Sequence, residues 1–269
     1  SLKPTKTLFK LSNEKAKAYK GTKKVTITSS KKATIDLGKV NNAVAIDMGH
    51  NYNVTISKLK FVGKKGGAYI NIAGSKRVKV ENCSFDNGVN KKGDAYQTAI
   101  TVNSAASTPC ENVRILSNTF QKLENGIAST KYKKNVFSTK VVIRKNTFKN
   151  MDSTAIKGKM WDNPVITSNT VKRTDKTNAT SSAVRLYSVK NPDVSGNTIR
   201  NCGYAVNIAR ASGINNTITS AKTERMKKNT VSSLRHYYVP YKNATQTRLL
   251  YFQTKEDKNF TITPSSKPY

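Results

Sequence analysis

The chain has 269 residues, of which 48 are basic and 15 acidic, and its formal net charge is +33. Three cysteines and two histidines are too few for a disulfide framework or zinc chemistry, and no apolar run reaches the roughly 18 residues of a membrane span. The charge predicts a polyanionic partner: an anionic polysaccharide (polyuronate, sulfated glycan or teichoic acid), anionic lipid or nucleic acid. A lysine coat that serves solubility alone is the alternative.

The first 24 residues are predicted to form a short N-terminal cap. The stretch "LSNEKAKAYK" (11–20) is the best helix candidate in the sequence, with Ser12 or Asn13 as its N-cap. A stack of strands needs such a cover, because its open end would be an exposed strand edge.

From residue 25 to residue 231 a short pattern of strand and turn recurs. Two alternating apolar residues precede Asn-Thr-apolar, as in "VRILSNTF" (113–120), "VVIRKNTF" (141–148) and "PDVSGNTI" (192–199). The equivalent positions are Leu59, Cys83, Asn118, Asn146, Asn169, Asn197, Asn216 and Asn229. Their spacing of a few tens of residues is typical of stacked supersecondary units, and the β-branched alternation predicts strands.

A second short strand precedes most copies. These strands are "AVAIDMG" (43–49), "AYINIAG" (68–74), "TAITVN" (98–103), "TAIKGKM" (154–160), "SAVRLYS" (182–188) and "YAVNIAR" (204–210). Parallel stacking places equivalent residues about 4.8 Å apart. We therefore expect Asn118, Asn146, Asn169 and Asn197 to face inward at a bend and to hydrogen-bond one another, with Thr outside and the next apolar residue in the core.

The V-x-I-x-x-N-x-F pattern of these coils resembles that of the right-handed parallel β-helix proteins of the pectate-lyase-like superfamily. The resemblance implies an all-β, single-domain right-handed parallel β-helix over 25–231, between the helical cap (1–24) and an irregular C-terminal cap (232–269). In this last segment "LRHYYVPY" and "TRLLYFQT" break the period, and a separate contact surface is the alternative. Lyases, hydrolases, epimerases, adhesins and phage spikes share the fold, so activity must come from the site.

Alternate residues of the second strand set are predicted to point outward. This places Lys157, Arg185 and Asn207 in one column on successive coils, with Lys159 and Tyr187 in the next column. The cations of "KYKK" (131–134) are expected to lie beside them.

The Lys-then-Arg pair resembles the arrangement in the chondroitinase-B and alginate-lyase branch of the superfamily. That resemblance implies β-elimination on a polyuronate, with Lys157 and Arg185 as base and charge neutraliser and Tyr187 as acid. The substrate-binding candidates are Lys131, Lys133, Lys159, Trp161, Asn207 and Arg210. Trp161 is interpreted either as a sugar platform or as a cap over a turn.

The same branch implies Ca²⁺ bound by acidic and Asn side chains. At the corresponding place the sequence offers only Glu124 and Asn125. Since hard cations require several oxygen ligands, no metal site is predicted and Ca²⁺ is left open as a cofactor. Hydrolysis is less consistent with the sequence, because its aspartates are scattered rather than paired.

A non-catalytic reading competes with the lyase reading: a cationic binding or adhesin module for anionic cell-surface or plant-wall polymers. Few acidic residues together with many Lys, Thr, Asn and Ser are typical of a Gram-positive bacterial surface protein, so we expect the protein to be secreted or at the cell surface. Non-specific binding to nucleic acid is expected from the charge. The sequence leaves the oligomeric state open.

Overall fold

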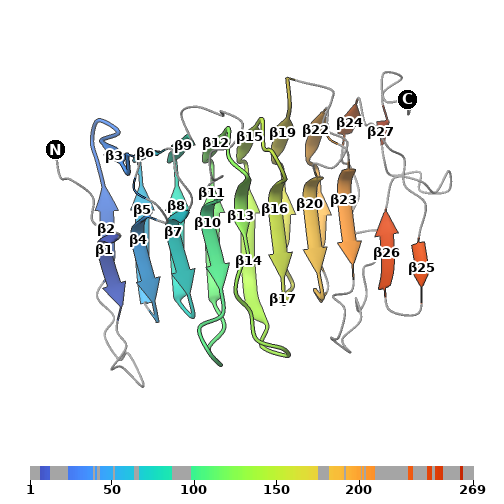
Figure 1. Cartoon of the computed structure of the whole chain (residues 1–269), viewed down its shortest axis with the longest axis horizontal. Helices are drawn as coiled ribbons and strands as arrows, with labels where there is room; N and C mark the ends of the chain where they lie inside the picture. Colours follow the sequence, from blue (N-terminus) through green and yellow to red (C-terminus); the bar gives the residue numbers. More distant parts are fainter. Residues whose placement is uncertain are drawn as a thin grey trace.

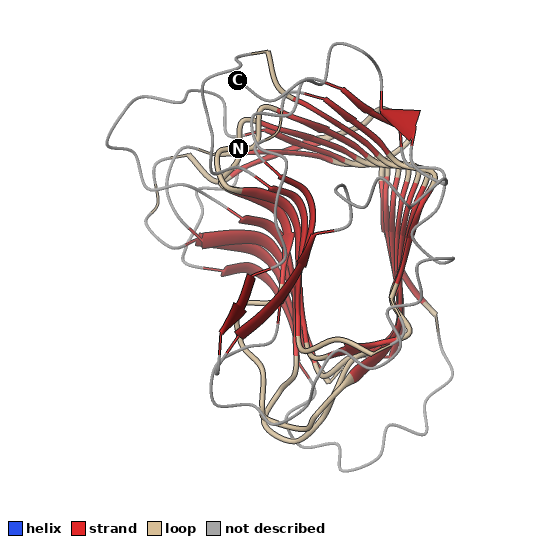
Figure 2. Ribbon diagram, turned by 90° about the vertical axis from the view of Figure 1, so that its right-hand side faces the viewer, coloured by secondary structure: helices blue, strands red, loops and turns tan. Residues whose placement is uncertain are grey.

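The computed structural model is a parallel β-solenoid, in which successive coils lie side by side along the long axis of the molecule (Figure 1). Seen along that axis, the strands fall into sheets that surround a common interior (Figure 2). The structure describes residues 7–12, 24–38, 40, 43–50, 52–63, 67–86, 98–174, 182–190, 192–200, 202, 204–209, 230–232, 241–243, 246–250 and 261–262.

The first sheet contains ten strands, and its parallel part is made of the second strand set of the sequence. In spatial order the strands are β1 (Thr7–Ser12), β4 (Ala43–Gly49), β7 (Gly67–Ala73), β10 (Thr98–Asn103), β13 (Asn125–Ala128), β16 (Thr154–Lys159), β20 (Ser182–Tyr187), β23 (Tyr204–Ala209), β26 (Gln246–Leu250) and β25 (Tyr241–Asn243). Pairing is parallel from β1 to β23, whereas β26 pairs antiparallel with both β23 and β25.

The other two sheets hold the strands on either side of the Asn-Thr motif. The second sheet contains β2 (Val25–Thr28), β5 (Tyr52–Ser57), β8 (Lys76–Glu81), β11 (Glu111–Leu116), β14 (Ser138–Arg144), β18 (Val165–Thr167) and β21 (Asp193–Ser195), with β17 (Trp161–Asp162) also on β14. The third sheet contains β3 (Thr34–Asp36), β6 (Lys60–Val62), β9 (Ser84–Asp86), β12 (Thr119–Gln121), β15 (Thr147–Lys149), β19 (Thr170–Lys172), β22 (Thr198–Arg200), β24 (Thr230–Ser232) and β27 (Thr261–Ile262).

The helix predicted over 11–20 is wrong at its start. Leu11 and Ser12 belong to β1, which pairs in register with β4, so the first sheet begins before residue 25. Residues 13–20 lie outside the described part of the chain. Within the residues that the structure describes there is no helix, and hence none long and apolar enough to cross a membrane.

The core is built by the predicted alternation. In β11, Val113 and Ile115 are buried while Arg114 between them is exposed. In the third sheet the apolar residue after each Asn-Thr pair points inward, and Phe61, Phe85, Phe120 and Phe148 form a stack with ring centroids 4.6–5.0 Å apart. Offset-stacked rings at this spacing add to the burial of their apolar area, which makes this column a principal element of the core.

The predicted asparagine ladder is confirmed. The backbone N–H and the Nδ2 of Asn118 both donate to Oδ1 of Asn146, at 2.9 and 3.1 Å, and Asn146 repeats this toward Asn169. Asn169 donates in the same way to Asn197. Each Nδ2 also donates to a strand carbonyl, such as that of Ile115 for Asn146. The four side chains are 1% exposed, so the ladder satisfies buried backbone groups at the bend between the second and third sheets.

Each ladder residue follows a residue with left-handed backbone. These residues are Ser117, Lys145, Ser168 and Gly196, and the same corner of earlier coils is held by Lys32, Lys58 and Asn82, with φ between 51° and 61° in every case. A left-handed residue turns the strand through a sharp corner, and the repeated corner brings the next residue of every coil into the same column. The turn therefore explains why one short motif recurs along the chain.

Candidate functional site

The predicted outward columns are present on the first sheet. Lys157 of β16 lies in register with Arg185 of β20, and Arg185 with Asn207 of β23. Lys159 lies in register with Tyr187. Neighbouring strands in a sheet are about 4.8 Å apart, so three cations and a phenol from adjacent coils occupy one small area of the surface.

Aromatic rings separate the cations of this area. The Nζ of Lys159 lies 4.8 Å from the ring centroid of Tyr132 and 5.4 Å from that of Tyr187. The guanidinium carbon of Arg185 lies 5.0 Å from the Tyr187 centroid. Cation–π attraction at these distances fixes the side chains. We name Lys157, Lys159, Arg185, Tyr187 and Tyr132 the cationic strip.

The environment of the cationic strip perturbs one of its groups. Partial burial lowers the pKa of Lys159, and the positive charges of Lys157 and Arg185 lower this pKa further. The Nε of Arg185 is buried and lacks a hydrogen-bond partner among the described residues. An anionic ligand bound here would reduce the repulsion among the three positive charges. It could also accept a hydrogen bond from the guanidinium of Arg185.

The segment that carries Lys131 and Lys133 is held beside the strip by its backbone. Oδ1 of Asn103 accepts the N–H groups of Thr130 and Lys131, both at 2.9 Å. The N–H of Lys133 donates to Ser104 at 3.0 Å, and its Nζ donates to Ser107 at 2.8 Å. Both lysines are exposed, as expected of substrate-binding candidates.

A polar ladder on the same face was not assigned a role from the sequence. Asn71 donates from Nδ2 to Asp47 at 2.7 Å, and its Oδ1 accepts from Thr101 at 2.6 Å and from Asn103 at 3.2 Å. Since Asn103 in turn holds Thr130 and Lys131, this ladder positions the segment from which Tyr132 reaches Lys159. The sequence signal is that these residues occupy the same outward columns as the strip.

One further candidate, Trp161, differs from expectation. Trp161 is fully buried on β17, and a Cβ added at Gly158 would lie 2.5 Å from its ring, so the indole packs inside the coil. It presents no face to a sugar, and the sugar-platform interpretation is wrong. Met160 has φ of 52°, which turns the chain inward just before the tryptophan. Asn207 lies in the predicted column, while Arg210 falls outside the described residues.

Asn125, one of the two residues implied as calcium ligands, lies inside the coil. Asn125 is 5% exposed, and its Nδ2 lies 3.4 Å from the hydroxyl of Thr98. Its side chain is thus enclosed rather than presented beside Lys157. Within the described ranges, no three His, Cys, Asp or Glu residues gather where they could hold a metal ion.

The comparison with protein families agrees with the architecture. Residues 70–234, more than half of the chain, match the family described as "Right handed beta helix region". Among solved structures, the chain is similar to a hyperthermoactive exopolygalacturonase from Thermotoga maritima, with 14% identity and a TM-score of 0.36. That match covers 67% of this chain and 55% of the other, so the chain spans about half the length of the exopolygalacturonase.

A surface adhesin of Streptococcus pneumoniae, PfbA, is also similar, with 15% identity and a TM-score of 0.36 over 79% of this chain and 74% of the adhesin. No curated protein matches the sequence.

Proposed function

The chain belongs to the right-handed β-helix family, and from that premise we propose that it is an extracellular or cell-surface protein whose cationic strip binds an acidic polysaccharide. The observation that carries the proposal is the register of Lys157 with Arg185 on adjacent strands, beside the rings of Tyr132 and Tyr187. Among the described residues, neither cation is in an ion pair with a carboxylate.

The chemistry of the strip matches that of an acidic polymer. A polyuronate or sulfated glycan carries charge at regular intervals, and the β-solenoid places the cations Lys157 and Arg185 on adjacent strands about 4.8 Å apart. The guanidinium of Arg185 can bind a carboxylate with two hydrogen bonds, while the tyrosine rings offer apolar surface to sugar C–H groups. The strip therefore provides both the charge and the contact area that an acidic sugar requires.

A second candidate function is β-elimination on the bound polymer, favoured by the lowered pKa of Lys159. In this reaction Arg185 neutralises the uronate carboxylate and a neutral lysine takes the C5 proton. The C4–O bond then breaks, the C4–C5 double bond forms, and Tyr187 protonates the leaving oxygen. Lys157 was the base expected from the sequence, and the direction of the pKa shift favours Lys159 for this role.

Binding is tested by measuring affinity for polygalacturonate, alginate, a sulfated glycan, teichoic acid and a neutral glucan at physiological salt. We expect the acidic polymers to bind more tightly and their affinity to fall as salt rises, because counterions are released on binding. Duplex DNA serves as a generic polyanion control. Equal affinity for the neutral glucan, or tighter binding of DNA than of every acidic glycan, would contradict the proposal.

Elimination is tested separately, because its unsaturated uronate product absorbs ultraviolet light. We expect Lys159→Ala to reduce the rate of product formation by about a hundredfold, the usual scale for an acid–base group, while binding changes much less. If no acidic polymer yields product and the binding results hold, the protein is a binding module.

A further inference from the structure

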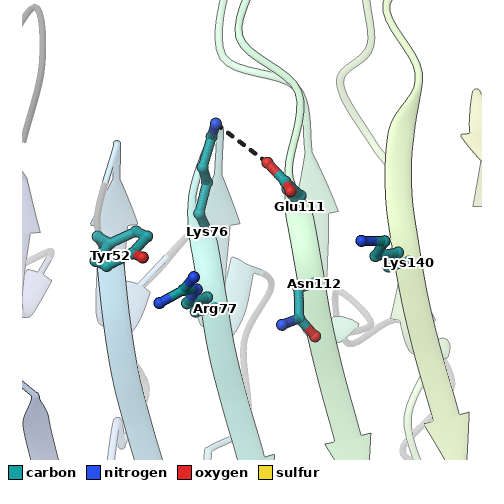
Figure 3. A pocket seen from close by; sticks show the side chains of 6 residues that line it. All are labelled: Tyr52, Lys76, Arg77, Glu111, Asn112 and Lys140. Carbon is teal, nitrogen blue, oxygen red and sulfur yellow. Dashed lines mark ion pairs between the residues drawn. The ribbon is translucent and has the colours of Figure 1, made fainter.

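A cleft lies on a different face from the cationic strip, over strands β5, β8, β11 and β14 of the second sheet. It encloses about 320 Å³, near the lower end of the range for small-molecule sites. Its lining residues are Tyr52, Lys76, Arg77, Glu111, Asn112 and Lys140, as Figure 3 shows. The lining is predominantly polar, which suits a hydrophilic ligand such as a sugar.

The backbone explains how neighbouring polar residues come to lie on the same face. Arg77, Asn112 and Lys140 are left-handed, with φ of 53°, 53° and 54°, and they occupy equivalent positions on successive strands. A left-handed residue interrupts the normal alternation of side chains along a strand. Lys76 can therefore face outward although Val78, two residues later, is fully buried.

The charges of the cleft are not balanced. The Nζ of Lys76 and the carboxylate of Glu111 form an ion pair at 3.1 Å, drawn as a dashed line in Figure 3. The guanidinium of Arg77 lies over the ring of Tyr52, 4.9 Å from its centroid. Neither Arg77 nor Lys140 is paired with a carboxylate in the part of the chain that the structure describes. Two cations thus remain for a ligand.

The arrangement of these two cations defines the ligand further. Arg77 on β8 and Lys140 on β14 lie on either side of Asn112 on β11. Two strand spacings place their backbones about 10 Å apart. An amide between two cations matches a ligand with anionic groups near its ends and hydroxyl groups between them, and the ring of Tyr52 offers an apolar surface at one side.

We propose that this cleft is a second binding site, which takes a short acidic oligosaccharide of two or three sugar units. Arg77 and Lys140 bind its acidic groups, and Asn112 binds its hydroxyl groups. The site is independent of the cationic strip, because it lies on another sheet and shares no residue with it. A protein with both sites can engage two segments of polymer at once, which raises the avidity for a long chain and bridges separate chains.

The test is calorimetric titration of the full chain with trigalacturonate at physiological salt. The double variant Arg77→Asn/Lys140→Asn removes both cations, and asparagine tolerates the left-handed backbone. Lys58→Asn/Lys145→Asn is the matched control, since these exposed lysines also have positive φ, 55° and 58°, and lie outside the cleft.

We expect the cleft variant to lose one binding event, with affinity at that site reduced about tenfold or more, while the control keeps the wild-type titration. Amide resonances of Arg77, Asn112 and Lys140 should shift with trigalacturonate in the wild-type protein. Equal titrations for the two double variants would overturn the proposal. Equal resonance shifts with inorganic sulfate at the same concentration would also overturn it, because the cleft would then bind any anion rather than the sugar. If the cationic strip does not bind acidic polymer, the binding event at the cleft should still be observed. Each proposal can therefore be refuted without the other.

Discussion

Replacing Asn146 by alanine tests the asparagine ladder that joins the coils. The side chain of Asn146 accepts the buried N–H of Asn118 at 2.9 Å and donates to the carbonyl of Ile115 at 2.9 Å. A buried donor left without an acceptor costs about 1–3 kcal/mol, and the lost bond to the carbonyl about 1 kcal/mol more. We therefore expect Asn146→Ala to lower the free energy of unfolding by about 2–4 kcal/mol.

The assay is urea unfolding followed by circular dichroism in the strand band. Thr147→Ala is the matched control, because Thr147 is adjacent in the chain, lies on the outer side of β15 and should change stability by no more than about 0.5 kcal/mol. If Asn146→Ala is as stable as this control, the ladder does not stabilise the stack and the physical account of the repeated motif is wrong.

Three further predictions concern single positions. Gly126→Ala should destabilise the fold by about 1–3 kcal/mol in the same assay, because the added Cβ would lie 2.5 Å from the ring of Phe148; wild-type stability would argue against the packing described. Gly196→Asn should keep or raise stability by about 0.4–1 kcal/mol, since φ of 61° suits asparagine and glycine costs more entropy on folding; a clear loss would contradict this. The pKa of Lys159 is lowered in the folded state, so the unfolded chain keeps this proton to higher pH. The free energy of unfolding of the wild type, relative to that of Lys159→Met, should therefore rise with pH between the lowered pKa and about 10.4. If this difference in stability falls with pH instead, the assigned direction of the pKa shift is wrong.

Much of the fold was predictable from the sequence because its signals are local and repeated. Alternating apolar residues and the Asn-Thr pair mark a strand and a corner within eight residues, as in "VVIRKNTF" (141–148). Once the coils are aligned on Asn146 and its equivalents, the stacking of Lys157 on Arg185 follows, because strands advance by one fixed spacing. The column of the cationic strip was therefore predictable.

The remaining features depend on where the backbone leaves the regular pattern. Trp161 continues the outward alternation of Lys157 and Lys159 in sequence, yet the left-handed Met160 ends that strand and turns the indole inward. The contact of Tyr132 with Lys159 depends on a loop held by hydrogen bonds to the preceding coil.

The cleft combines residues from four successive coils, and the positive φ of three of them is not revealed by any pattern of apolar residues. Arginine and lysine rarely adopt a left-handed backbone, so this conformation could not be predicted for Arg77 and Lys140 from their residue types.

The central claim is that the position of cations on the first sheet, rather than the total charge, determines binding of acidic polysaccharide. The most direct measurement compares two double variants with equal loss of charge. Lys157→Met/Arg185→Met removes two of the three cations of the strip, whereas Lys172→Met/Arg200→Met removes a pair in register on the third sheet. At physiological salt we predict that the first variant binds polygalacturonate at least about tenfold more weakly than the wild type and that the second stays within about threefold. Equal losses in the two variants would show that charge alone drives binding and would contradict the account.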